Sequence, residues 1–258
     1  MLRRLTLPLY LLLPLLWLFR RPLFSGEAFA FRDSAFYYYP FYRYVQQRWS
    51  TGIPLWNPLD GIGQPLLGDP TAAVFYPPKL VFSLPLPYTC CFATYVVGHL
   101  LLGGLGAYCF ARQLKANRHG SMLAGVTYQL SGHVLFQYCN PIYLVGAAWL
   151  PFALLCVCRM TRRDHPARDA TWLGIVLSLM VLGGAPQMAM HTVLCAAVWC
   201  ILSWVDRFRD GATQQSKKGR LPLVLLSLSC LLAVLLAAVQ VLPSKEWAAR
   251  SDRASSEL

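Results

Sequence analysis

The chain has 258 residues, of which 56% are hydrophobic and only 13% are charged, and its mean hydropathy is +0.44. Because a soluble domain carries about 25% charged residues, this composition excludes an ordinary soluble protein. The net charge of +12 does not indicate a nucleic-acid-binding protein, since the cations lie in short segments beside apolar runs.

The apolar residues fall in blocks, and seven of these blocks are predicted to be membrane-spanning helices. A helix needs roughly 17 to 25 mostly apolar residues to cross a bilayer. The predicted spans are Leu5–Phe19 (extending to Phe24), Cys90–Phe110, Ser121–Tyr138, Pro141–Cys158, Ala170–Gly184, Pro186–Trp204 and Leu221–Pro243. The sequence therefore predicts an all-α, polytopic transmembrane helix bundle of about seven spans.

The N-terminal segment has the features of either a signal peptide or an uncleaved anchor. Arg3 and Arg4 precede an apolar run, as in a signal peptide, and residues 28–30 (Ala-Phe-Ala) resemble a cleavage site. Arg20 and Arg21 separate that site from the apolar run by a longer stretch than a signal peptide usually has. The sequence favours an uncleaved first span over residues 5–24.

The distribution of Lys and Arg predicts the orientation in the membrane. They concentrate in the N-terminal segment and in the loops 111–118, 159–168 and 207–220, which alternate spans place on one side. Short loops rich in Lys and Arg lie on the cytoplasmic side. We therefore expect one membrane domain over residues 1–258 with a cytoplasmic N-terminus. Its parts are the first span, an extracytoplasmic loop at 25–87, a six-span bundle at 88–243 and an extracytoplasmic tail at 244–258.

The long loop is the one extended polar segment between apolar runs, and it contains Asp33, Asp60 and Asp69. Asp33 and Ser34 are expected to cap a short helix, which Pro40 interrupts and residues 41–49 resume. The many aromatic residues of this part suit the membrane interface. Residues 79–87 are apolar but too short to span, which predicts a re-entrant or interfacial segment.

Few polar side chains fall within the predicted spans, and they limit the classes of function. From the second span onward there is no Asp, Glu, Lys or Arg, which disfavours an ion-coupled transporter. Gln187 and His191 are four residues apart and thus share one helix face, either for interhelical hydrogen bonds or for ligand contacts. The nine cysteines lie in or beside the spans and lack the paired spacing of a zinc site, so we expect apolar packing.

Several separated motifs together resemble the N-terminal part of the bacterial YfhO-type membrane proteins, which are related to the GT-C glycosyltransferases. The motifs are Asp33 followed by Tyr-Tyr-Tyr-Pro-Phe, residues 52–58 (Gly-Ile-Pro-Leu-Trp-Asn-Pro), 63–65 (Gly-Gln-Pro), 76–77 (Tyr-Pro), 128–132 (Tyr-Gln-Leu-Ser-Gly), 149–152 (Trp-Leu-Pro-Phe), 184–187 (Gly-Ala-Pro-Gln) and 240–243 (Gln-Val-Leu-Pro) with Glu246, Ser251 and Arg253. Their order covers essentially the whole chain. Members of that family are longer, so we expect this chain to be a fragment or a truncated product.

The resemblance implies an enzyme of the bacterial inner membrane. It would move a sugar from a polyprenyl-phosphate donor to an extracytoplasmic cell-envelope acceptor. GT-C enzymes carry an essential acidic residue in the first outer loop, and Asp33 matches that position, where it would accept the acceptor's proton. Asp69 is a second acidic candidate, ahead of Asp60, although it also suits a turn. The implied donor contacts are Arg32, Arg43 and Lys79 for phosphate, Trp56 for sugar stacking, and Gln187 and His191.

Two other interpretations remain open at this stage. The same outer loop would also serve a non-catalytic membrane protein that binds or translocates lipid-linked intermediates, and an inactive N-terminal fragment would share every motif. The paired acidic residues of some GT-C members are absent, because Ser34 follows Asp33. The expected partners are the lipid bilayer, the polyprenyl-phosphate sugar and the envelope glycan, without nucleic acid. No cofactor is assigned, and a divalent metal stays open.

Overall fold

The computed structural model describes residues 2–49, 51–59, 63–162, 165–209 and 221–250. Asp60 and the tail beyond Arg250 lie outside the described residues. The described chain contains eleven α-helices and a single two-stranded pairing, so the all-α prediction is confirmed.

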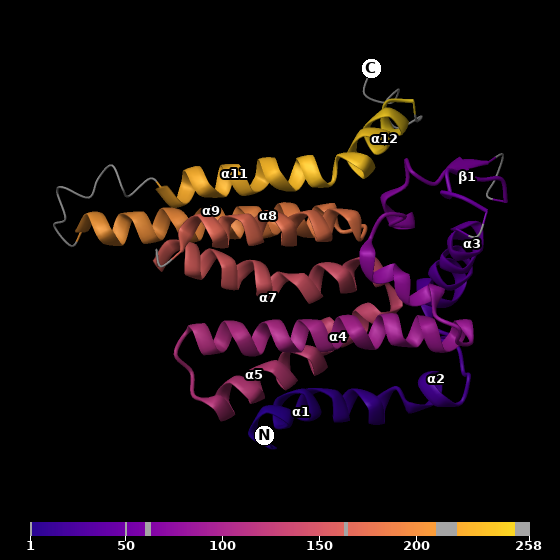
Figure 1. Ribbon diagram of the computed structural model, residues 1–258, viewed down its shortest axis with the longest axis horizontal. Helices are drawn as coiled ribbons and strands as arrows, with labels where there is room; N and C mark the ends of the chain where they lie inside the picture. Colours follow the sequence, from indigo (N-terminus) through magenta and orange to yellow (C-terminus); the bar gives the residue numbers. More distant parts are fainter. Residues whose placement is uncertain (1, 50, 60–62, 163–164, 210–220, 251–258) are drawn as a thin grey trace.

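Most of the α-helices run side by side in a bundle (Figure 1). In chain order, the helices in and next to this bundle are α1 (Leu2–Leu18), α2 (Arg20–Phe24), α4 (Tyr88–Gln113), α5 (Arg118–Leu130), α6 (Gly132–Phe136), α7 (Pro141–Arg162), α8 (Pro166–Leu182), α9 (Pro186–Arg209), α11 (Leu221–Leu236) and α12 (Ala238–Ala249). Of these, α12 is angled away from the others. The main contacts pair α4 with α5 and α7, and α8 with α7 and α11. The order across the bundle therefore largely follows the order of the chain.

Three helices are long and apolar enough to cross a membrane, namely α4, α7 and residues Pro186–Asp206 of α9. The pair α11 and α12 provides a fourth candidate, although α12 turns away from α11 by 76°. The helices indicate a multi-pass membrane protein. The predicted third and fifth spans correspond to shorter helices, because α5 has 13 residues and α8 has 17.

Small residues let the helices of the bundle approach closely. A side chain at Gly104 of α4 would meet Gln129 of α5, and one at Gly106 would meet Phe152 of α7. The fully buried Gln129 uses the room left by Gly104, and its amide donates to the carbonyl of Leu11 at 2.7 Å. Such polar contacts stabilise helix pairs in an apolar surrounding, and this one fixes α5 against α1.

The outer segment between α2 and α4 folds at one end of the bundle (Figure 1). It contains the π-helix η1 (Ser34–Tyr38), α3 (Tyr39–Trp49), the antiparallel pair β1 (Trp56–Asn57) and β2 (Gln64–Pro65), and the 3-10 helices η2 (Pro70–Ala72) and η3 (Pro77–Ser83). A small core of its own, formed by Val45, Leu66, Ala72 and Val74, packs inside it. The segment is thus a folded cap and not a tether.

Helix α12 also contacts this cap. Its buried Gln240 donates to the carbonyl of Leu67 at 2.7 Å, and the side chain of Trp247 lies against Gly68. The sharp turn at Ala237 brings these residues over the cap instead of extending α11 (Figure 1). Residues far apart in the sequence therefore meet at this end of the bundle.

Two local predictions for the cap were wrong. Asp33 makes no side-chain capping hydrogen bond, and Pro40 does not interrupt the helix, because helical backbone continues from Ser34 to Trp49. The π-helical turn supplies the reason. The N–H of Tyr39 donates to the carbonyl of Ser34, five residues back, so the backbone is already widened where Pro40, which has no N–H, enters.

A buried chain of hydrogen bonds attaches the cap to the bundle. Nδ1 of His99 in α4 donates to the carbonyl of Tyr95 at 2.7 Å, so Nε2 accepts from the hydroxyl of Tyr76 at 2.8 Å. The indole N–H of Trp149 in α7 donates to the same hydroxyl at 2.8 Å. Tyr76 and His99 are 2% and 3% exposed, so water cannot replace these bonds.

We predict that Tyr76→Phe destabilises the protein by about 1 to 3 kcal/mol, because Trp149 and His99 would each lose a buried partner. The measurement is denaturant unfolding of the purified chain in detergent, followed by tryptophan fluorescence. Tyr44→Phe is the matched control, since its hydroxyl bonds to the carbonyl of Trp56 at a more exposed position. Equal losses in the two variants would contradict the anchoring role of Tyr76.

Candidate functional site

Asp33 lies at the start of the cap between two irregular backbone features. Arg32 has a φ of +51°, in the left-handed region that is uncommon for residues other than glycine, and the π-helix η1 begins at Ser34. Both features occur often at functional sites. The carboxylate of Asp33 is exposed to solvent, while the guanidinium of Arg32 lies over the ring of Phe136, 5.9 Å from its centroid.

Asp69 comes from a distant part of the cap but reaches the same tyrosines. Its carboxylate accepts from the backbone N–H and the hydroxyl of Thr71, each at 2.8 Å, and from the hydroxyl of Tyr37 at 3.4 Å. Asp69 therefore forms the turn at η2, as one interpretation of the sequence expected, and it also faces η1. Whether it has a chemical role stays a prediction.

Tyr38 connects this acidic region with the bundle. Its hydroxyl donates to Oδ1 of Asn140, just before α7, at 2.8 Å. Burial raises the pKa of the Tyr38 phenol strongly, and the neighbouring Tyr37 and Asp33 raise this pKa further. The fold thus brings Asp33 and Asp69, separated by 36 positions in the sequence, around one pair of tyrosines. The phenol of Tyr38 stays protonated there.

The other predicted contact residues lie apart from this acidic region. Arg43 is exposed on α3, over the ring of Tyr88 at 5.9 Å. Trp56 lies against Gly63 and lines a shallow hollow of about 300 Å³ together with Arg48.

Gln187 and His191 are both exposed in the first two turns of α9. Within the described part of the chain, no hydrogen bond or ion pair joins these two side chains to Asp33 or Asp69. Their assignment as donor contacts stays a prediction.

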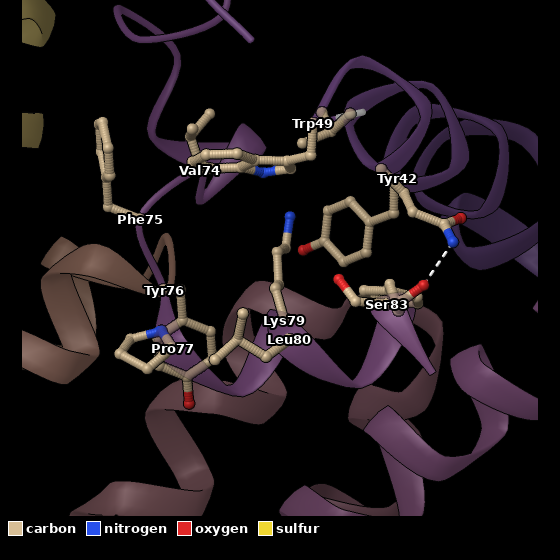
Figure 2. Close-up of a pocket in the computed structure, with 12 residues that line it drawn as sticks. Tyr42, Trp49, Val74, Phe75, Tyr76, Pro77, Lys79, Leu80 and Ser83 are labelled. Carbon is tan, nitrogen blue, oxygen red and sulfur yellow. Dashed lines mark hydrogen bonds between the residues drawn. The ribbon is translucent and has the colours of Figure 1, made fainter. Parts of the chain in front are cut away.

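Lys79 occupies the largest of the pockets that we describe. The pocket, of about 510 Å³, lies between α3 and η3, with Lys79 at its centre (Figure 2). The ammonium of Lys79 lies 3.3 Å from the centroid of the Tyr42 ring and donates to the carbonyl of Ala72 at 2.5 Å. Apart from Lys79, the walls are mainly aromatic and aliphatic: Tyr42, Val45, Gln46, Trp49, Val74, Phe75, Tyr76, Pro77, Leu80, Phe82 and Ser83.

Burial changes the ionisation of both polar groups at the centre of this pocket. It lowers the pKa of Lys79 well below 10.5, and the negative charge of Asp69 opposes this effect only in part. Burial also raises the pKa of the Tyr42 phenol well above 10.0. The pocket therefore holds a lysine that loses its proton unusually easily and a phenol that keeps its proton.

The described residues offer little for metal binding. Among them, no three His, Cys, Asp or Glu side chains come together as metal ligands. All nine cysteines are free. The described residues of the cap offer carboxylates, a half-buried amine, arginines and aromatic rings.

Sequence reasoning named Lys79 but missed the pocket around it. The signal was present, because Lys79 is the one charged residue between Asp69 and Arg112.

Sequence reasoning also missed Asp169, which is buried in the first turn of α8 and pairs with Arg168 at 3.6 Å. An acidic side chain there interacts favourably with the helix dipole, which is a structural role at the end of α8 opposite the cap (Figure 1).

No protein-family model, no curated protein and no solved structure matches the chain. The interpretation of its function therefore depends on the residues and their geometry.

We predict that Lys79 makes stability depend on pH. Because its pKa is lowered in the folded state, the unfolded chain binds more protons at this residue between the folded pKa and about 10.5. The contribution of Lys79 to the free energy of unfolding therefore rises with pH across that window, by at most about 1.4 kcal/mol per pH unit.

The measurement is the difference in unfolding free energy between the parent protein and Lys79→Met in detergent from about pH 8 to about pH 10. Lys245→Met, at an exposed position on α12, is the control. If the difference in unfolding free energy between the parent protein and Lys79→Met does not change with pH, the prediction is contradicted.

Proposed function

We propose that the chain is part of a multi-pass membrane protein of the YfhO type, related to GT-C glycosyltransferases. It transfers a sugar from a polyprenyl-phosphate donor to an extracytoplasmic acceptor of the bacterial cell envelope. In this proposal the cap faces the outside of the inner membrane, the N-terminus is cytoplasmic, and about seven segments cross the bilayer. The three to four candidate spans and the cap at one end of the bundle support this arrangement.

The observation that carries the proposal is the backbone around Asp33. A left-handed Arg32 and the π-helix η1 flank this residue on either side, and Asp69 reaches the adjacent Tyr37. Strained or irregular backbone persists where the surrounding structure holds it in place. Here it holds the exposed Asp33 at the surface of the cap, and a carboxylate at that position supports the proposed role of this residue as a general base.

The proposed step is one in-line displacement at the anomeric carbon. The acceptor hydroxyl oxygen forms the new bond to that carbon while the bond to the lipid phosphate oxygen breaks. The carboxylate of Asp33 takes the hydroxyl proton, and the phosphate leaves with the electron pair of the broken bond, so the configuration inverts. Arg32, next to Asp33, is placed to stabilise the charge on the leaving phosphate.

A second candidate function is non-catalytic binding or translocation of lipid-linked intermediates. The exposure of Asp33 favours it, since the carboxylate lies outside both pockets described above. A general base acts within reach of the proton that it abstracts and out of bulk water. The catalytic proposal therefore requires that bound donor and acceptor cover Asp33.

We predict that Asp33→Asn abolishes the envelope glycan that depends on the full-length gene, because loss of a general base costs about 10²- to 10⁴-fold in rate. The measurement compares envelope glycans of cells with the intact gene, a deletion and the variant. Glu27→Gln is the matched control, since this acidic residue is also exposed and lies just upstream.

The outcomes separate the candidates. An unchanged glycan profile on deletion contradicts sugar transfer under the conditions used. A glycan that is lost on deletion but retained in Asp33→Asn contradicts catalysis by Asp33 and favours the binding function.

A further inference from the structure

We propose that the pocket between α3 and η3 binds a long-chain fatty acid, with the carboxylate on Lys79 and the hydrocarbon chain along the aromatic and aliphatic walls. This inference does not use the carboxylates of the proposed glycosyl transfer, because neither Asp33 nor Asp69 lines the pocket. It gives Lys79 a different role from the donor-phosphate contact that the resemblance implies.

The charge of the pocket calls for an anion. Lys79 is the one ionisable cation among the lining residues, and in the described part of the chain it takes part in no ion pair. Its ammonium contacts a carbonyl and the face of an aromatic ring, neither of which carries a full negative charge, and the charge of Asp69 acts on it without forming an ion pair. Lys79 is half-buried. A cation partly withdrawn from water is costly unless it is paired, so a ligand carboxylate would stabilise it.

A second polar group at the centre of the pocket is unsatisfied. The Tyr42 side chain is 1% exposed, and its hydroxyl, which interacts with that of Tyr95, makes no hydrogen bond of normal geometry. Figure 2 shows this hydroxyl pointing toward Lys79, with Ser83 on the same side of the pocket. The amide of Gln46 is already used, since it donates to the carbonyl of Phe82. One ammonium and two hydroxyls would match the two oxygens of a carboxylate.

The small number of donors argues for a monoanion rather than a phosphate. Phosphate sites use several cations, arginine forks or backbone N–H groups. The nearby arginines of α3 are directed elsewhere, since Arg43 lies over Tyr88 and Arg48 donates to the hydroxyl of Tyr44 at 2.9 Å. The polyprenyl-phosphate donor of the proposed transfer is thus a poor match for this pocket.

The remainder of the pocket suits a hydrocarbon chain. Its volume of about 510 Å³ lies in the range typical of small-molecule sites, which are mostly apolar with a few placed polar groups. The rim includes Trp49 and Leu80, which are 43% and 72% exposed, and exposed Leu84 and Leu86 follow along the chain. An apolar rim beside the candidate span α4 fits a ligand that arrives from the outer leaflet.

The test uses the purified chain in detergent, freed of bound lipid, with hexadecanoate as the probe. Binding is followed by native mass spectrometry and by quenching of tryptophan fluorescence with a brominated fatty acid, because Trp49 lines the pocket. We expect saturable binding of hexadecanoate. Lys79→Met should weaken it by about 10- to 100-fold, the effect of losing a charged hydrogen bond. Lys245→Met should leave it unchanged.

Further ligands and variants make each outcome decisive. Methyl hexadecanoate, which has the same chain without the charge, should bind as weakly to the parent as hexadecanoate binds to Lys79→Met. Lys79→Arg should retain part of the affinity, and Tyr42→Phe should reduce it.

Equal binding of acid and ester would overturn the ionic role of Lys79. Tighter binding of hexadecyl phosphate than of hexadecanoate would overturn the assignment to a fatty acid. Thermal unfolding of each variant in the same detergent shows that a loss of binding does not reflect misfolding.

Discussion

The position of the cap depends on the hydroxyl of Tyr76. This one atom accepts from Trp149 of α7 and donates to His99 of α4, so it joins both central helices of the bundle to the segment that precedes η3. Tyr76 and His99 are buried and Trp149 is partly buried, so each bond would leave a buried polar group unsatisfied if it were broken. The cap can therefore move little relative to α4 and α7 without a large cost.

This constraint also explains the pocket of Lys79. Tyr76 directly precedes η3, and one turn of this 3-10 helix later Lys79 lines the same pocket, which α3 also borders. The ring of Tyr42 that the Lys79 ammonium contacts belongs to an aromatic cluster. Tyr42 lies edge to face with Phe82 and tilted against Phe92, and Phe82 stacks on Tyr95. The face of the Tyr42 ring attracts the ammonium of Lys79 and so holds it in place, although burial makes the charged form of the lysine less favourable.

The acidic region and the Lys79 pocket are two separate places on the cap. Asp33 and Asp69 surround Tyr37 and Tyr38 at the surface, whereas Lys79 lies in a deeper and less polar site. The proposed sugar transfer uses the surface position, and the proposed binding of an amphiphile uses the pocket. The two proposals thus concern two different places on the same folded segment.

The sequence by itself determined the broad class of this protein, because blocks of apolar residues and the scarcity of charges leave only a helical membrane bundle. It also located the polar loop and singled out Asp33, Asp69 and Lys79 as residues of interest. The tertiary structure decided the rest. The π-helical turn before Pro40, the bend between α11 and α12, and the meeting of Tyr76 with Trp149 and His99 all depend on contacts between residues far apart in the chain. Local periodicity carries no information about such contacts, since a buried tyrosine and an interfacial tyrosine look alike in sequence until their partners are known.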